Sequence, residues 1–307
     1  MVKCLITKLK EVTDNGSLLK IGELSFHLPV GKQPTQYNRK ICIISSADTE
    51  ARVTNGYFTD NNFSGNIGSV SKVTANVLSR LIMANNECNI FIGGKYSLLK
   101  IDLENWNGSN IVDSDVEFDI SNLTFCKKLQ NLNAPQSKFY GDISSLKDLN
   151  NMQSINLSYT KVTGDISVFA RKSNLMSLGF NATKVGGNIE TLSDCPLLET
   201  MSLGYDVAIT GDASRMPSKF RNLTAGNLAN LTWKNSRNTS YPIISFISAT
   251  GINFGEDLDA MLINQATCAI PNSGAKSMTV IGKKTSASDS AIATLQQKGY
   301  TVSVTSV

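Results

Sequence analysis

Acidic side chains recur at a regular spacing through the middle of the chain. The series runs Asp119, Asp142, Asp165, Asn188 and Asp212, with spacings of 23, 23, 23 and 24 residues. Carboxylates stacked at one position of a repeating structure could bind Ca²⁺ through their oxygen atoms. The same residue types also close turns, because their side chains accept hydrogen bonds from nearby backbone N–H groups. Asn188 interrupts the row of charges, so the sequence favours the turn role and predicts no metal site.

The single histidine, His27, lies in the stretch 24–28, where apolar and polar residues alternate. In an extended strand it shares a face with Ser25, opposite the three apolar residues of that stretch. A solvated strand histidine is therefore the favoured interpretation. A Cys-His catalytic pair would need a cysteine folded against His27, and nothing in the sequence places one there.

The cysteines are dispersed along the whole chain. They are Cys4, Cys42, Cys88, Cys126, Cys195 and Cys268. None of them forms a C-x-x-C or another metal-ligand spacing, which predicts free, partly buried thiols in a reducing compartment rather than a disulfide framework. The chain also lacks a phosphate-binding glycine motif and paired catalytic carboxylates, so no enzymatic activity and no cofactor are predicted.

The acidic series belongs to a longer repeat. Four of its members directly follow a glycine, at Gly141, Gly164, Gly187 and Gly211, and the clearest motif reads Gly-Asp-Ile-Ser. A second pattern, L-x-x-L-x-L, keeps the same period. It begins at Leu129, Met152, Leu175, Leu198 and Phe220. Two independent patterns that share one period of about 23 residues indicate a solenoid.

This second pattern resembles the leucine-rich repeat family, in particular the longer repeats whose second half reads L-x-G-x-I-P. The chain departs from that family at two positions. The usual asparagine is Thr160 or Thr183 in the clear repeats and Ser137 or Asp206 in others, and the proline is absent. Threonine can still bond neighbouring backbone along a ladder. We therefore expect an α/β solenoid of leucine-rich repeats with a parallel β-sheet, preceded by a small β-rich or α+β N-terminal module.

Alternation along each short strand points the leucine-type residues inward and the intervening residues outward. The outward residues are small, polar and uncharged: Asn131, Asn133, Ser154, Asn156, Ser177, Gly179, Thr200, Ser202, Asn222 and Thr224. Such a face could hydrogen-bond a glycan or lie against a protein chain, although it has no aromatic anchor. A merely solvated face is the alternative. Near the repeat corners, Phe139, Tyr140, Tyr159 and Tyr205 are either a candidate aromatic edge or packing groups.

Composition excludes several classes of partner. The 29 basic and 25 acidic residues give a net charge of +4, and no basic run is interleaved with aromatic residues, so no nucleic-acid partner is predicted. No stretch approaches the roughly 18 apolar residues of a membrane helix. Residues 1–10 also lack the apolar core of a secretory signal, so neither a membrane helix nor a signal peptide is predicted.

Residues 1–105 do not share the repeat and are predicted to form an anchoring or oligomerisation module. Strands are expected over 2–9, 18–28, 40–44, 88–92 and 98–103, with a loop over 60–71 and a helix over 74–85. The segment 98–103 is also a candidate for the first solenoid strand, because it reads L-x-x-I-x-L. The solenoid proper is placed at 106–239.

After residue 226 the repeat weakens. Strands are expected over 243–247, 277–282 and 300–304, and helices over 257–266 and 288–298. Terminal repeats of a solenoid differ from the others, because an open end would expose the core. Residues 240–307 are therefore predicted to hold divergent last repeats and a C-terminal cap.

Three stretches resemble structural proteins of tailed phages that infect Bacteroides-type gut bacteria, including crAss-like phages. They are residues 1–26, the Thr-x-Val-x-Gly-Asp-Ile repeats and residues 285–302. The resemblance implies a tail or head-fibre component of the virion, made in the host cytoplasm. It also implies a homo-oligomer in which residues 1–105 contact other virion proteins and the solenoid projects toward a host surface protein or glycan.

The alternative is a bacterial leucine-rich-repeat protein that binds a partner inside the cell, or an effector exported by a route without a signal peptide. A virion component should be multimeric, with residues 1–105 sufficient for assembly. A monomeric binder should lose its activity when outward residues such as Asn156 and Ser177 are replaced by bulky ones.

Overall fold

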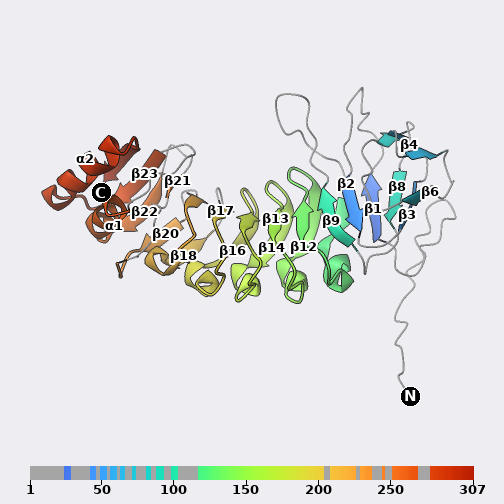
Figure 1. Ribbon diagram of the computed structural model, residues 1–307, viewed down its shortest axis with the longest axis horizontal. Coiled ribbons are helices and arrows are strands. Elements are labelled where there is room, and N and C mark those ends of the chain that lie inside the picture. The colour runs from blue at the N-terminus through green and yellow to red at the C-terminus, as the bar shows by residue number, and fades with distance from the viewer. Residues whose placement is uncertain are drawn as a thin grey trace, which may run out of the picture.

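The computed structural model describes residues 117–203, 208–225, 229–236, 251–268 and 277–307 continuously, together with short strands in the remaining parts of the chain. Figure 1 shows an elongated molecule in which similar turns follow one another along the long axis. The end with the N-terminus lies on the right of that view and the end with the C-terminus on the left.

Each repeat supplies one strand to each of two sheets and then a short 3₁₀ helix. In the repeat that begins at Met152, these are β13 (Ser154–Asn156), β14 (Lys161–Asp165) and η3 (Ile166–Phe169). Ile155, Val162 and Phe169 are fully buried, one from each element. A repeat cannot cover these side chains by itself, so its stability depends on the neighbouring repeats.

One sheet has eight strands and contains the L-x-x-L-x-L segments. Its order is β2 (Cys42–Ser45), β9 (Leu98–Asp102), β11 (Asn131–Asn133), β13, β15 (Ser177–Gly179), β17 (Thr200–Leu203), β19 (Asn222–Ala225) and β21 (Ile244–Ser245). From β9 to β21 all neighbours are parallel, and β2 is antiparallel to β9. The parallel sheet is therefore confirmed, and the segment 98–103 does supply its first parallel strand.

The other sheet has thirteen strands. Its order is β24 (Thr301–Ser306), β23 (Ser277–Gly282), β22 (Ile252–Gly255), β20 (Ala229–Thr232), β18 (Ile209–Asp212), β16 (Lys184–Asn188), β14, β12 (Lys138–Asp142), β10 (Glu117–Asp119), β1 (Leu24–Leu28), β8 (Cys88–Ile92), β3 (Thr49–Val53) and β6 (Ser71–Val73). Neighbours from β24 to β10 are parallel. Beyond β10 the pairing is antiparallel. The chain is therefore a leucine-rich-repeat solenoid whose two sheets both continue into antiparallel strands from the N-terminal region.

Two expectations for the N-terminal region are wrong. The sequence predicts a helix over 74–85, but Leu81–Met83 form strand β7. The expected loop over 60–71 contains β5 (Phe63–Gly65), and both strands pair with β4 (Gly56–Asp60) in a separate three-stranded sheet. Pairing between distant segments overrides the local helical pattern here. The strand predicted over 2–9 lies outside the described residues.

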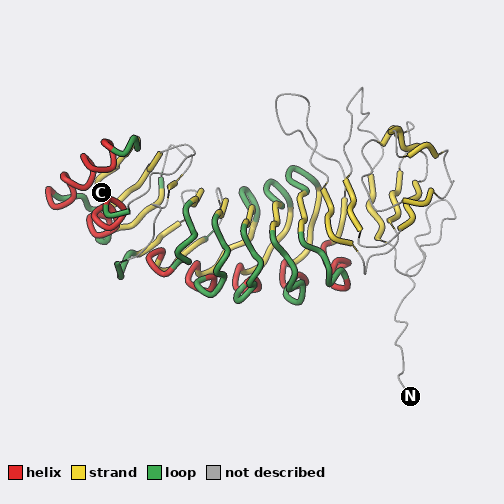
Figure 2. The backbone as a smooth tube through the Cα atoms, in the orientation of Figure 1, coloured by secondary structure: helices red, strands yellow, loops and turns green. Residues whose placement is uncertain are grey.

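The 3₁₀ helices stack along one edge of the solenoid, the lower edge in Figure 2. They are η1 (Ile120–Phe125), η2 (Ile143–Leu146), η3, η4 (Ile189–Leu192) and η5 (Ala213–Arg215). Each carries apolar residues into the core, for example Ile143 and Leu146 of η2. The core is one continuous cluster that extends from Ile101 to Tyr300.

The repeat continues further than the sequence pattern indicates. Strands β20, β22, β23 and β24 begin 23, 25 and 24 residues apart. In this part α1 (Leu258–Ala266), η6 (Ser286–Ser288) and α2 (Asp289–Gln297) connect the parallel strands. The predicted helices are confirmed with slightly shorter bounds, and the last strand runs to Ser306 instead of Val304. No helix in the described part of the chain is long and apolar enough to cross a membrane.

Candidate functional site

The outward residues of the eight-stranded sheet line a shallow groove of about 510 Å³. All the positions predicted from alternation contribute to it: Asn131, Asn133, Ser154, Asn156, Ser177, Gly179, Thr200, Ser202, Asn222 and Thr224. Ser158 and Asn181 also line the groove, and the sequence reasoning missed them. They follow β13 and β15 at the same repeat position, 23 residues apart. That spacing is the signal that could have identified them.

The strand geometry explains why these residues face the groove. On each strand of the groove the central residue is buried, as Leu132, Ile155 and Leu178 show, and its neighbours are half-buried. Gly179 is the exception, because it is buried although its register points outward. A Cβ atom at Gly179 would lie 2.8 Å from Oδ1 of Asn156. The glycine therefore makes room for the Asn156 amide and offers no side chain of its own.

Hydrogen bonds between rungs hold the polar groups of the groove in place. Thr200 Oγ1 donates to Ser177 Oγ over 2.9 Å, and Asn181 Nδ2 donates to Ser202 Oγ. The backbone N–H of Asn181 also donates to Ser158 Oγ over 3.2 Å. Because each of these bonds joins neighbouring repeats, the solenoid fixes the orientation of the donors and acceptors before any ligand arrives.

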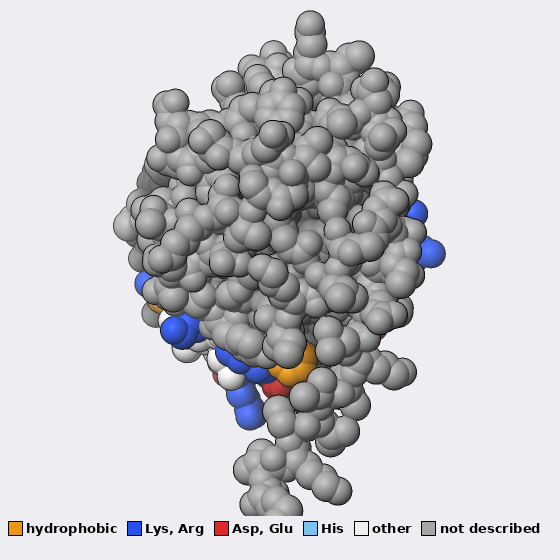
Figure 3. Space-filling model, turned by 90° about the vertical axis from the view of Figure 1, so that its right-hand side faces the viewer, with side chains coloured by type: hydrophobic (Ala, Val, Ile, Leu, Met, Phe, Trp, Pro, Cys, Tyr) orange, Lys and Arg blue, Asp and Glu red, His pale blue; other side chains and the backbone are white. Residues whose placement is uncertain are grey.

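The groove carries no charged side chain among its lining residues. Ion pairs lie at the repeat turns instead, such as Lys127 with Asp148 at 3.4 Å and Arg171 with Asp194 at 3.9 Å. In Figure 3, which views the molecule from its right-hand side in Figure 1, Lys and Arg side chains are visible at the lower left and at the right edge. The groove is therefore suited to a neutral, polar ligand surface rather than to a strongly charged one.

The acidic series at the repeat period has a structural role. Oδ1 of Asp119, Asp142 and Asp165 accepts a hydrogen bond from the backbone N–H two residues later, at 2.9, 2.7 and 2.8 Å. Asn188 makes the same bond at 2.8 Å, which explains why an amide can replace the carboxylate. The turn interpretation is therefore confirmed. Among the described residues no group of three or more His, Cys, Asp or Glu side chains could hold a metal ion.

The glycines before these residues interlock with the preceding repeat. Gly164 has φ of +122°, and a Cβ there would lie 2.7 Å from Ile143 Cγ1 and 2.8 Å from Asp142 Oδ1. Gly187 has φ of +130° and the same relation to Asp165. The Gly-Asp pair thus couples each repeat to the next, because the glycine of one repeat lies against the capping carboxylate of the previous one.

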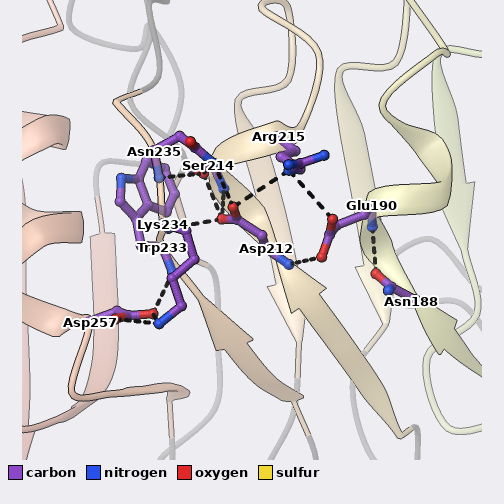
Figure 4. Close-up of polar contacts among 9 residues, drawn as sticks. All are labelled: Asn188, Glu190, Asp212, Ser214, Arg215, Trp233, Lys234, Asn235 and Asp257. Carbon is purple, nitrogen blue, oxygen red and sulfur yellow. Dashed lines mark hydrogen bonds and ion pairs between the residues drawn. The ribbon is translucent and has the colours of Figure 1, made fainter.

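Asp212 is the one buried member of the series, and Figure 4 shows it at the centre of a polar network. Its carboxylate accepts from Ser214 N at 3.0 Å and Ser214 Oγ at 2.6 Å, and from Lys234 N at 3.2 Å and Asn235 Nδ2 at 2.9 Å. Glu190 Oε1 accepts from the backbone N–H of Asp212 at 2.9 Å. Burial opposes ionisation, but these hydrogen bonds outweigh it and hold the pKa of Asp212 below its ordinary value.

Lys172 lies inside the solenoid with 3% of its surface exposed. Its Nζ donates to the carbonyl oxygens of Lys147 at 2.7 Å and Leu149 at 3.1 Å, which follow η2 in the preceding repeat. Burial lowers the pKa of Lys172, and nearby Asp148 partly offsets that effect. Lys298 caps the end of α1 in a similar way, through the carbonyl oxygens of residues 266 and 268.

Three cysteines with described side chains, Cys126, Cys195 and Cys268, are buried free thiols, which confirms the expectation for these three. Cys195 Sγ donates to the Phe169 carbonyl oxygen over 3.2 Å, and burial raises the pKa of its thiol. A raised pKa keeps the sulfur protonated at neutral pH, so Cys195 is a packing residue.

The candidate aromatic edge is only partly formed. Phe139 is fully buried, whereas Tyr140 is 47% and Tyr159 is 50% exposed. Tyr205 lies outside the described residues. The threonine ladder also differs from the expectation, because Thr160 Oγ1 bonds the Leu157 carbonyl oxygen of its own repeat at 2.6 Å. Thr183 makes the equivalent bond within its repeat, so these hydroxyls close turns and do not connect neighbouring repeats.

No protein-family model and no curated protein matches the chain. Among solved structures it is similar to the leucine-rich-repeat ectodomain of the plant membrane receptor kinase GASSHO1/SCHENGEN3 from Arabidopsis thaliana, in complex with CASPARIAN STRIP INTEGRITY FACTOR 2. That match has 15% identity and a TM-score of 0.40, and covers 60% of this chain and 24% of the ectodomain, so the chain spans about a quarter of that ectodomain's length. It is also similar to an internalin (inlF) from Listeria monocytogenes, with 14% identity, a TM-score of 0.24 and coverage of 67% and 82%.

Proposed function

We propose that this chain is a non-enzymatic binding module that holds a neutral protein or glycan surface in the groove of the eight-stranded sheet. The observation that carries the proposal is the groove itself. Every outward position of five successive strands, β11 to β19, lines it, and all of these positions are small or polar and uncharged. Charged residues make up 18% of the chain and concentrate on surfaces, so an uncharged set of ten outward positions differs from an average protein surface.

The groove suits an extended ligand more than a compact one. Neighbouring rungs of a β-sheet are spaced by about 4.8 Å, so the five strands present polar groups at a regular interval. The hydrogen bond from Thr200 to Ser177 fixes the rotamers of both side chains, so the remaining lone pairs of their hydroxyl oxygens point in defined directions. No aromatic residue lines the groove, so affinity per site should be modest and should increase when several copies act together.

The finer proposal is that the chain is a structural component of a phage virion, in the tail or as a head fibre. It is supported by the resemblance of residues 1–26, the Thr-x-Val-x-Gly-Asp-Ile repeats and residues 285–302 to such proteins. In this proposal residues 1–105 attach the chain to other virion proteins, and the groove faces a host surface protein or glycan.

Two measurements test these proposals separately. Fluorescently labelled full-length chain should bind intact Bacteroides-type cells, or capsular polysaccharide purified from them, in a saturable manner. Absence of binding to both would contradict a host-facing groove. Antibody against the chain should label one fixed place, tail or capsid, in electron micrographs of purified phage particles. If the chain occurs only in cell extracts and never on particles, the virion proposal fails and an intracellular binder remains.

A further inference from the structure

The thirteen-stranded sheet ends at β24 (Thr301–Ser306). All six residues of β24 pair in parallel with β23, from Ser277 opposite Thr301 to Gly282 opposite Ser306. On its other side β24 has no neighbouring strand in the described part of the chain. An edge strand of this kind offers a row of backbone N–H and C=O groups to another chain.

The direction of the backbone groups follows from one hydrogen bond. The N–H of Val307 donates to the Gly282 carbonyl oxygen over 3.3 Å, so Val307 points its backbone groups toward β23. Backbone direction alternates along a strand, so Ser303 also points toward β23. Val302 and Val304 therefore direct their N–H and C=O groups toward the open edge.

The sequence of β24 is symmetrical about Ser303. It reads Thr-Val-Ser-Val-Thr over 301–305, the same in both directions. Antiparallel pairing of two such strands about a two-fold axis at Ser303 brings identical residue types opposite each other. Ser303 then faces Ser303 of the second copy, and Val302 faces Val304 of the second copy. Because both valines point their backbone groups outward, each valine pair can exchange both of its hydrogen bonds.

The side chains fit the same arrangement. Thr301, Ser303 and Thr305 are exposed, whereas Val302 and Val304 are half-buried and pack against the core on the other face. Pairing across the two-fold axis would place the half-buried valines of two copies side by side and remove more of their apolar surface from water. The small hydroxyl residues on the opposite face present no bulk or charge that would prevent it.

β24 also lacks the features that usually protect an edge strand. Neither a charged residue nor a proline nor a glycine occurs from Thr301 to Ser306, and β23 and β24 pair without a register shift. Inward or edge charges, prolines and bulges are the common means of preventing edge-to-edge pairing. β24 pairs with β23 along its whole length and is rich in β-branched residues, but it lacks these protective features. Its free edge therefore differs from edge strands that are protected against pairing with another chain.

We propose that β24 is a homodimerisation edge, at which two copies of this chain pair antiparallel about Ser303 and continue the thirteen-stranded sheet from one copy into the other. The interface is isologous, so it closes at two copies and does not generate a fibre. It is also small, so dissociation in the micromolar range is expected. This assembly does not depend on what the groove binds.

The test is the mass of the full-length chain by light scattering over a concentration series. The wild-type chain should shift toward twice its 33.2 kDa as concentration rises. Ser303→Lys and Ser303→Asp should each weaken self-association at least tenfold, because like charges then face each other across the axis. Equimolar mixing of the two variants should restore the dimer, because Lys then faces Asp.

The matched control is Thr279→Lys. Thr279 is the β23 residue opposite Ser303, so it lies on the same face but one strand away from the edge. This control should retain the wild-type mass at every concentration. A wild-type chain that stays monomeric, an assembly unchanged by Ser303→Lys, or variants that do not recover on mixing would each overturn the proposal. Circular dichroism of each variant shows whether the fold is retained, and the mixing experiment needs only folded variants.

Discussion

The two faces of this solenoid use similar polar residues for different purposes. On the eight-stranded sheet, side chains such as Ser177 and Thr200 bond each other across rungs. Among the groove residues, Asn156 also accepts a turn bond of the capping type, from the backbone N–H of Ser158. Beside the thirteen-stranded sheet, Asp142, Asp165 and Asp212 bond backbone N–H groups that close each repeat. The difference indicates that hydroxyl positions of the first face, such as Ser177 and Thr200, can vary in sequence with little effect on folding, whereas the capping positions of the second face cannot.

The largest expected effect is at a glycine of the second face. Gly164→Ala forces a side chain into φ of +122° and against Ile143 and Asp142, so it should lower the free energy of unfolding by about 4 kcal/mol. Urea unfolding followed by circular dichroism measures the change. Gly255→Ala is the control, because Gly255 has φ of +52° and open space around it, and should cost only about 1 kcal/mol. Equal costs at the two positions would refute the interlocking role.

Asp212→Ala should have the next largest effect. It leaves the buried Ser214 hydroxyl and the part-buried donors of Lys234 and Asn235 without their acceptor, at a cost of about 3 kcal/mol. Asp165→Ala removes an exposed cap of the same type and should cost about 1 kcal/mol. A similar cost at both positions in urea unfolding would show that burial does not distinguish them.

The lowered pKa of Asp212 also predicts an acid dependence. Its stabilising contribution is fully present above the ordinary value of 3.8 and is lost as the pH falls through the lower pKa of the folded state. Acid unfolding of the wild-type chain should therefore include a component that Asp212→Ala lacks. Acid titrations of the two proteins, followed by Trp fluorescence, provide the comparison. If stability falls by the same amount with decreasing pH in both proteins, the acid dependence does not come from Asp212.

Lys172 predicts the opposite pH dependence. Its pKa in the folded state is below the ordinary 10.5, so the unfolded chain binds more protons between the two values and stability rises with pH in that window. Lys172→Met should abolish that rise and change stability at neutral pH by only about 1 kcal/mol. Urea unfolding at a series of alkaline pH values measures both. If the stability of Lys172→Met still rises with pH in this window, a group other than Lys172 causes the rise.

The smallest expected effect is at a strained turn between the two faces. Gln136, Tyr159 and Ala182 occupy the same repeat position with φ of 54°, 59° and 50°. Ala182→Gly relieves this strain but adds freedom to the unfolded chain, so a net gain of about 0.5 kcal/mol is expected. Ala170→Gly, at φ of −53°, should instead lose stability by a similar amount. Thermal unfolding should move in opposite directions for these two variants.

Periodicity made much of this fold predictable. Buried positions such as Ile155 and Leu178 and the residues between them follow directly from alternation within a repeated strand. Lys172 did not, because its interior position holds Leu149 in the preceding repeat and Cys195 in the next one. The pattern of one repeat cannot show that a lysine will be paired with carbonyl groups of its neighbour. The strand at Leu81–Met83 was missed for a related reason, since its partner β4 is distant in sequence.

The groove was predictable as a surface but not in its detail. Alternation identified its outward positions, including Gly179. It did not show that the Asn156 side chain covers Gly179, so that the glycine offers no contact surface of its own. It also missed Ser158 and Asn181, which lie just beyond the strands where alternation no longer applies. Contacts between neighbouring repeats determine these features, so the residue pattern within a single repeat cannot predict them.

One paired measurement tests most directly whether the groove is the binding face. Ser154→Trp fills the groove from a half-buried position on β13, and Thr163→Trp makes the same change at a half-buried position on β14 of the other sheet. Binding to Bacteroides-type cells or their capsular polysaccharide should fall at least tenfold for Ser154→Trp and stay unchanged for Thr163→Trp. The free energy of unfolding of Ser154→Trp should remain within about 0.5 kcal/mol of wild type. Equal loss of binding in both variants, or undiminished binding by Ser154→Trp, would contradict the account.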